Sequence, residues 1–217
     1  MTITQLQRSL DANYMSIVRK VKQVQKVFEL LDQEMTAFQQ KSGLGCLSGC
    51  GHCCTKPDIS AAVLEFLPYA FDLFLQKKSH IVKDQLANNP QGICHLFKSN
   101  GLGGFGQTLG GCTEYNHRGL ICRLFGFSTV RDKLGKPLLS TCRLIKQTQA
   151  EEITQAEKLV QEGLAPGYLF YYQKLTQIDF RMGQEYLPIN EAIIKAIDEV
   201  ENYYHYRPFP YSFRKSA

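Results

Sequence analysis

The chain has 217 residues, of which 44% are hydrophobic and 21% are charged, a balance typical of a globular protein with its own core. The first residues, MTITQLQRSLDANYMS, hold no apolar stretch such as a secretory signal needs, and no apolar run approaches the roughly 18 residues of a membrane helix. We therefore expect a cytoplasmic protein with no membrane partner. The net charge of +5 is too modest for a nucleic-acid-binding protein, so no nucleic-acid partner is expected either.

The first forty residues predict one long helix, residues 1–42, which ends at the glycine-rich stretch KSGLG. Its apolar residues recur in alternating steps of four and three: Leu10, Tyr14, Ile17, Val21, Val24, Phe28, Leu31, Met35 and Phe38. This stripe allows two interpretations. The helix lies along the protein's own body, or it forms a coiled-coil arm that makes a homodimer or binds a partner protein. The aromatic residues and Met in place of regular Ile and Leu layers favour the first.

Two further helices are expected before residue 90. Residues 56–79 have a helical composition, with Asp58 or Ser60 as the N-cap and Pro68 as a bend or break. Ser79 is expected to cap a short helix that runs through Gln85.

Residues 91–145 are rich in glycine and predict loops with short strands. The stretch RLFGFSTVRDKLGKPLLST predicts a β-hairpin with DKLGK as its turn. GLGGFG, residues 101–106, matches the phosphate-binding pattern GxGxxG but lacks the flanking strand, helix and acidic residue. We therefore expect a hairpin loop there.

The chain turns helical again near residue 148. A helix is expected in TQAEEITQAEKLVQEG, and a last one in INEAIIKAIDEVENYYHY, with Asn190 as its cap. The tail RPFPYSFRKSA is expected to run extended along the surface. The predicted fold is thus mainly α, with a long N-terminal helix and C-terminal helices around an irregular, cysteine-rich metal-binding centre that holds a short β-hairpin. We expect a single domain over 1–217, made of the helix 1–42, a core 44–145 and a helical region 146–217.

The cysteines carry the clearest chemical signal. Four fall within the nine residues CLSGCGHCC, and the full set is Cys46, Cys50, Cys53, Cys54, Cys94, Cys112, Cys122 and Cys142. In a reducing compartment such thiols favour metal binding over disulfides, and Gly49 and Gly51 allow the tight turn that aims neighbouring sulfurs at one point. All eight are predicted metal ligands.

Three other interpretations of the cysteines compete with metal binding. One or two of them, Cys142 above all, can be small buried apolar residues. Cys53 and Cys54 can form a strained vicinal disulfide. Disulfides throughout would need an oxidising compartment, which the sequence does not indicate.

The spacing favours an iron–sulfur cluster over Zn²⁺, because a zinc site usually uses two CxxC-like turns and clusters accept irregular spacing. The run Cys46-x3-Cys50-x2-Cys53 also fits the signature of radical S-adenosylmethionine enzymes. Those enzymes place it after the first strand of a βα barrel, whereas a long helix precedes it here.

The cysteine motifs together resemble the YkgJ-type cysteine-cluster family over residues 44–145. The resemblance rests on CGHCC, CHLF and GCTEYNHRGLICRLFGF, through these residues: Cys46, Cys50, Cys53, Cys54, Cys94, Phe97, Cys112, Tyr115, Arg118, Cys122, Arg123 and Phe125. The chain departs from the family pattern by one extra residue after Cys46, and by His95 and Gly119 in place of proline. The resemblance implies chelation of zinc or iron. A flagellin lysine N-methylase holds a related cysteine-rich domain, which makes a methylase-like enzyme one candidate.

Arg118 and Arg123 allow two interpretations. They offset thiolate charge or hold an anionic substrate, or they form salt bridges to Glu65 or Glu114. His52, His95 and His117 are expected beside the metal or on the surface rather than as ligands.

Three functions stay open from the sequence. They are an iron–sulfur protein with a redox or protein-modifying role, a zinc-stabilised binding or adaptor module, and the methylase-like enzyme. Whether the protein is an enzyme is open as well.

Overall fold

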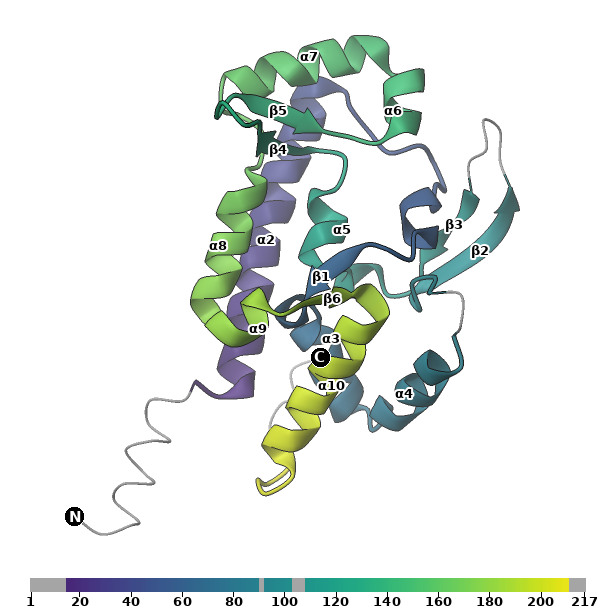
Figure 1. Ribbon diagram of the computed structural model, residues 1–217, viewed down its shortest axis with the longest axis vertical. Coiled ribbons are helices and arrows are strands. Elements are labelled where there is room, and N and C mark those ends of the chain that lie inside the picture. Colours follow the sequence, from purple (N-terminus) through teal and green to yellow (C-terminus); the bar gives the residue numbers. More distant parts are fainter. Residues whose placement is uncertain (1–14, 90–91, 103–107, 211–217) are drawn as a thin grey trace, which may run out of the picture.

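A computed structural model describes residues 15–89, 92–102 and 108–210 (Figure 1). The structure is mainly helical, as predicted. Its α-helices are α2 (Ile17–Ser42), α3 (Leu67–Leu75), α4 (Ser79–Ala87), α5 (Leu120–Leu124), α6 (Arg143–Thr148), α7 (Ala150–Gln161), α8 (Tyr168–Ile178), α9 (Phe180–Gln184) and α10 (Ile189–Tyr204). Short 3₁₀ helices are η1 (His52–Thr55), η2 (Val63–Phe66) and η4 (Tyr115–His117). The strands are β1 (Ser60–Ala62), β2 (Phe97–Leu102), β3 (Thr108–Cys112), β4 (Ser128–Arg131), β5 (Pro137–Ser140) and β6 (Tyr186–Pro188).

The long helix α2 packs against several other helices of the molecule. Ser16 caps its start by accepting a hydrogen bond from the Arg19 backbone N–H, and Gly43, with a φ of 72°, ends it as predicted. The apolar stripe is buried over these residues: Ile17, Val21, Val24, Phe28, Leu31, Met35 and Phe38. The stripe packs against the protein's own helices, among them α3, α7 and α8 (Figure 1). The first interpretation of the stripe is therefore confirmed for residues 17–38, whereas Leu10 and Tyr14 lie outside the described residues.

The buried apolar side chains form one cluster that extends from Ile17 on α2 to Val200 on α10. Helix α10 packs across α3 and η2, so the C-terminal part of the chain covers the segment that follows the first cysteines. Burial of apolar area in such a cluster is the main stabilising contribution to a fold of this size.

The segment 56–79 differs from its prediction. Residues Ser60–Ala62 form β1, which pairs antiparallel with β6, and α3 begins only at Leu67. Pro68 lies in the first turn of α3, where its missing N–H costs nothing, so it neither bends nor breaks the helix. The strand depends on its pairing with a distant segment, which local sequence does not reveal.

Three predicted helix caps are wrong. The N-cap of α3 is Phe66 and neither Asp58 nor Ser60. Helix α4 begins at Ser79 with Lys78 as its N-cap, and it ends at Ala87 instead of Gln85. Pro188 is the N-cap of α10, and Asn190 lies within its first turn. The side chain of Asn190 bonds to another segment, as described below.

The central region contains two hairpins. Strands β4 and β5 form the predicted hairpin, and the Asp132 side chain accepts hydrogen bonds from the backbone N–H groups of Leu134 and Lys136 in its turn. Strands β2 and β3 form a second hairpin on either side of residues 103–107, which lie outside the described residues. Most of the predicted GLGGFG loop falls in that gap.

The C-terminal region contains the two predicted helices. Helix α7 precedes Gly163, which has a φ of 74°, and α10 is the last helix. The aromatic stretch between them, for which no element was predicted, forms α8. Of the tail, Phe209 stacks on Phe74 of α3 with ring centroids 5.2 Å apart, and residues 211–217 lie outside the described residues.

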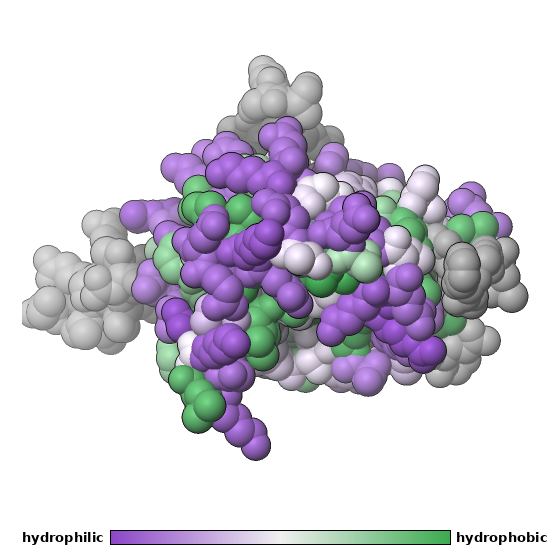
Figure 2. Space-filling model, turned by 90° about the horizontal axis from the view of Figure 1, so that it is seen from above, coloured by the Kyte–Doolittle hydropathy of each residue, from purple (hydrophilic) through white to green (hydrophobic). Residues whose placement is uncertain are grey.

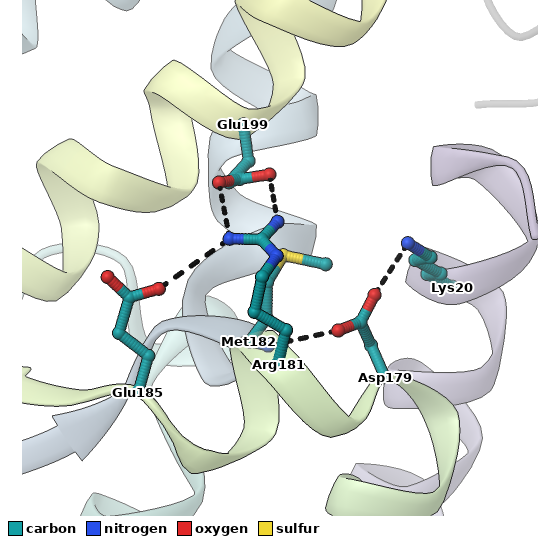
Figure 3. Close-up of polar contacts among 6 residues, drawn as sticks. All are labelled: Lys20, Asp179, Arg181, Met182, Glu185 and Glu199. Atoms are coloured by element: carbon teal, nitrogen blue, oxygen red, sulfur yellow. Dashed lines mark hydrogen bonds and ion pairs between the residues drawn. The ribbon is translucent and has the colours of Figure 1, made fainter. Parts of the chain in front are cut away.

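A polar cluster around α9 joins the two long helices (Figure 3). Asp179 accepts a hydrogen bond from the Met182 N–H, which caps α9, and pairs at 2.6 Å with the buried Lys20 of α2. Arg181 forms a two-point ion pair with Glu199 of α10, with N–O distances of 2.9 and 2.6 Å. These contacts fix the direction in which α9 leads into β6.

No helix within the described ranges is both long and apolar enough to cross a membrane. The face of the molecule shown in Figure 2 is mostly hydrophilic, with smaller hydrophobic areas between the polar side chains.

Candidate metal centre

All eight cysteines line a single cavity of about 1290 Å³. They reach it from the segment 46–54, from both sides of the β2–β3 hairpin, from α5 and from the start of α6. Every one of them is a free thiol, so neither a vicinal disulfide nor a disulfide framework is present in this structure. Cys142, the residue that most resembled a core apolar position in the sequence, lines the cavity with the others.

The first cysteine segment folds through tight turns. Gly49 has a φ of 65°, a backbone conformation that favours glycine, and precedes Cys50. The Cys54 N–H donates to the Gly51 carbonyl at 2.9 Å as the chain enters η1. Sequence reasoning identified the turn correctly, and its role is to bring closely spaced thiols to one side of the cavity.

The β2–β3 hairpin is fastened to this segment by its backbone and by one aromatic ring. The Gly110 N–H donates a hydrogen bond to the Gly49 carbonyl at 2.8 Å. The backbones of Cys50 and Leu109 also pair as an isolated antiparallel β-bridge. The Phe97 ring packs so closely on Gly51 and Gly110 that a Cβ atom at either glycine would overlap it. Both glycines are therefore required for a close approach of two chain segments.

Two side-chain amides hold the backbone beside cysteines. The side chain of Asn190 in α10 accepts a hydrogen bond from the His95 N–H and donates one to the Ile93 carbonyl, both at 2.9 Å. It therefore holds the two residues that flank Cys94. Gln149, the N-cap residue of α7, accepts from the Gly45 N–H at 3.0 Å and donates to the Gly45 carbonyl at 2.7 Å. Gly45 directly precedes Cys46.

Glu65 holds the backbone next to Cys122 by accepting a hydrogen bond from the Ile121 N–H. Its carboxylate is fully buried and accepts hydrogen bonds from the backbone N–H groups of Ala62 and Ile121, both at 2.8 Å, and from the Tyr172 hydroxyl at 2.9 Å. Burial raises the pKa of Glu65 to about 7, and these hydrogen bonds oppose the increase. The sequence indicates that Glu65 lies near the motif, but two of its donors, the Ile121 N–H and the Tyr172 hydroxyl, come from distant segments and follow only from the fold.

Arg118 and Arg123 both form ion pairs with Asp32 of α2, so the salt-bridge interpretation holds with a different partner from the two expected. Arg123 is buried, and its guanidinium also donates to the carbonyls of Asn116 and Arg118. Arg118 lies over the Tyr115 ring at 4.0 Å. Both arginines line the cavity and place positive charge beside the thiols.

The thiols are close enough to influence one another. Partial burial, followed by the neighbouring thiols Cys50, Cys53 and Cys142, raises the pKa of Cys46 to about 11. The pKa of Cys53 is lowered to about 7 because its sulfur accepts a hydrogen bond from the Cys54 thiol. Several thiolates in one cavity repel each other, and a bound cation removes that cost by replacing their protons.

The pKa of Cys112 is raised by burial, and the Arg118 guanidinium partly offsets that increase. An arginine on this wall therefore favours the thiolate form of a nearby cysteine, which is the form that binds metal.

The donor set fits a sulfur-ligated cofactor. Thiolates are soft ligands that suit iron–sulfur clusters and zinc. In the part of the chain that the structure describes, however, no three His, Cys, Asp or Glu side chains stand close enough to hold one metal ion. The thiols line a cavity and do not converge on one point as their spacing suggested.

His52 and His117 occupy different surroundings. His52 lines the cavity, and its Nδ1 atom is buried without a hydrogen-bond partner. The Nε2 atom of His117 lies 3.7 Å from the Asp72 carboxylate, and its ring packs at a tilt against Tyr69; His117 is outside the set of residues that line the cavity.

The chain matches no known protein family, no curated protein and no solved structure. The resemblance to the YkgJ-type family therefore rests on the cysteine motifs alone.

Proposed function

We propose that this protein binds a metal cofactor, an iron–sulfur cluster or zinc, through the cysteine thiolates of its cavity. The observation that carries the proposal is that all eight cysteines, although spread over nearly a hundred residues, line one cavity. Cysteines that serve only as small apolar residues would be distributed through the core. Here each is a free thiol, and seven of the eight are only half-buried.

The arrangement favours an iron–sulfur cluster over zinc. A zinc ion needs four ligands within about 2.3 Å of one point, whereas a cluster spreads its ligands over several iron atoms. Thiols that line a cavity of about 1290 Å³ without forming a group for one ion agree better with the larger cofactor. Two arginines on the same wall would offset part of the charge of such a cluster.

The proposal is tested with a pair of neighbouring substitutions. Cys142 and Thr141 both line the cavity, and the Thr141 hydroxyl has no hydrogen-bond partner. Cys142→Ser removes a sulfur ligand, whereas Thr141→Val changes the adjacent residue at nearly constant volume. Both variants are purified without oxygen, and iron, zinc and acid-labile sulfide are measured per chain.

We expect Cys142→Ser to contain clearly less metal than the wild-type protein and Thr141→Val to contain as much. Iron with sulfide identifies a cluster, and zinc without visible colour identifies a zinc site. Equal metal content in both variants, or a wild-type protein without metal, would contradict the proposal.

A further inference from the structure

The cysteine cavity has room for a small molecule, and its wall carries an excess of positive charge. Its volume of about 1290 Å³ exceeds the range of about 300–1,000 Å³ that is usual for small-molecule sites. Apart from the cysteines, the described residues that line it include one acidic side chain, Asp32, and four basic ones: Lys56, Arg118, Arg123 and Arg143. A cleft lined mainly by one sign of charge concentrates ligands of the opposite sign, so this wall favours an anion.

The protein itself uses the guanidinium of Arg123. This side chain is buried and paired with Asp32, and it donates hydrogen bonds to the carbonyls of Asn116 and Arg118. Its Nε, Nη1 and Nη2 atoms therefore each have a partner, and the guanidinium lies 4.5 Å from the centroid of the Phe28 ring. Arg123 thus fastens the segment before α5 to α2 and has little left to offer a ligand.

The guanidinium of Arg118 is oriented but only loosely paired. Its ion pair with Asp32 has an N–O distance of 3.5 Å, longer than the about 2.7–2.9 Å of a charge-assisted hydrogen bond. Its Nε atom is buried and has no hydrogen-bond partner in the part of the chain that the structure describes, although 24% of the side chain is exposed. Buried polar atoms nearly always have a partner, so this donor indicates a group that comes from outside the chain.

Neighbouring residues hold Arg118 in place. The guanidinium lies over the Tyr115 ring at 4.0 Å from its centroid, which fixes the plane of the group. The Arg118 carbonyl accepts a hydrogen bond from the Arg123 side chain at 3.2 Å, so the backbone is held as well. A guanidinium oriented in this way binds a carboxylate or phosphate with little further loss of conformational freedom.

We infer that the cavity binds a small organic anion and that Arg118 holds its carboxylate or phosphate group. The partly exposed ring of Phe125 lines the same cavity and offers an apolar surface to the rest of the ligand. Because the cysteines line this cavity too, the anion lies in the same chamber as the proposed metal cofactor. The anion site uses no metal ligand, so it goes beyond the proposed function and stands or falls separately from it.

The first test compares three probes of similar size on the full-length protein. Benzoate carries a carboxylate, phenyl phosphate carries a phosphate, and benzamide is the uncharged counterpart of benzoate. Binding is measured by isothermal titration calorimetry at low salt, with metal content determined per chain on the same samples. We expect an anion to bind at least about tenfold more tightly than benzamide, and the tighter of the two anions identifies the group that the site prefers. If neither anion binds, or if benzamide binds as tightly, the inference is wrong.

The second test compares two variants that each lose one positive charge. Arg118→Met removes the guanidinium from the cavity, whereas Arg19→Met removes an exposed one on α2 that does not line the cavity. We expect Arg118→Met to weaken anion binding about tenfold or more, the effect of one lost charge-assisted hydrogen bond, and Arg19→Met to leave it unchanged. Equal affinities in the two variants overturn the inference, while bound metal would still support the proposed function. A metal-free protein that binds the anion through Arg118 overturns the proposed function alone.

A measurement on the wild-type protein covers the case in which Arg118→Met fails to fold or loses metal. Phenylglyoxal modifies accessible guanidinium groups, and mass spectrometry of the peptides locates the modified arginines. The bound anion is expected to slow the modification of Arg118 and to leave that of Arg19 unchanged. Equal modification of Arg118 with and without the anion refutes the inference.

Discussion

The contact between Phe97 and two glycines allows a sharp test of how the hairpin is seated on the cysteine segment. A Cβ atom at Gly110 would overlap both the Phe97 ring and the backbone carbonyl of Lys98, and a backbone atom cannot swing aside as a side chain can. The neighbouring Gly111 has nothing within 4 Å of its Cβ position. Gly110→Ala and Gly111→Ala are therefore a matched pair in one strand.

The two substitutions reduce the conformational freedom of the unfolded chain equally, so their difference isolates the contact. Overpacking of a close contact costs about 1–3 kcal/mol, whereas an open surface position changes stability by no more than about 0.5 kcal/mol. We expect Gly110→Ala to lower the free energy of unfolding by the larger amount. It should also lower the metal content, because Cys112 ends β3 and the Cys94 carbonyl accepts a hydrogen bond from the N–H of Phe97, the first residue of β2.

The assay is urea unfolding of the protein as purified, followed by circular dichroism, with metal content measured on the same samples. Equal unfolding free energies and equal metal contents for the two variants would refute the idea that this contact sets the position of the hairpin.

Three further substitutions test the scaffold around the cavity. Asn190→Asp keeps the acceptor for one backbone group beside Cys94 but loses the donor to the other, and we expect a cost of about 1–3 kcal/mol together with weaker metal retention. Glu65→Gln replaces one acceptor oxygen by a donor, so one buried N–H loses its partner at a similar cost. Asp179→Asn keeps the cap of α9 but removes the carboxylate charge that faces the buried Lys20, which should cost about 3–5 kcal/mol at neutral pH. Chemical denaturation with parallel metal analysis measures all three.

The Asp179 variant also has a defined pH dependence. Burial acts to raise the pKa of Asp179, but the hydrogen bonds from Lys20 and Met182 outweigh it and lower the pKa below the ordinary 3.8. The folded protein therefore binds fewer protons than the unfolded chain in this range, so the carboxylate stabilises the fold above pH 3.8 and progressively less as pH falls below it. The difference between wild type and Asp179→Asn should shrink in that acid range. A difference that stays constant with pH would contradict the role of the charge.

For the other two variants, the contradicting results concern metal. If Asn190→Asp or Glu65→Gln lost stability but kept full metal content, these side chains would support the fold without positioning the cysteines. The double variant Lys20→Met with Asp179→Asn should recover part of the lost stability, because it also removes the buried charge that Asp179 neutralises in the wild-type protein.

Much of the helical framework could be predicted because its signals are local. The stripe on α2 repeats within one helix, and Gly43 and Gly163 mark helix ends by their own conformational freedom. The hairpin around Asp132 is likewise encoded in its turn. Strand β1 could not be predicted, since β6, with which it pairs, is distant in sequence.

The cysteines could be identified from the sequence, but the means by which they are positioned could not. Asparagine is a residue type that often caps helices, so the sequence suggested that role for Asn190. Its hydrogen bonds to the residues on both sides of Cys94 exist only because α10 lies against that segment. Gln149 carries no local signal for its bonds to Gly45. Likewise, the sequence suggested convergence on a point, and the fold instead distributes the thiols around a cavity.

The central claim is that the cavity thiols bind metal, and it is tested most directly on the wild-type protein purified without oxygen. Iron, zinc and acid-labile sulfide are measured per chain together with the number of thiols that react with a thiol reagent before and after denaturation. We predict bound metal, with iron and sulfide in the favoured case, and thiols that are protected until the protein is unfolded. A metal-free protein in which all eight cysteines react in the native state would contradict the account.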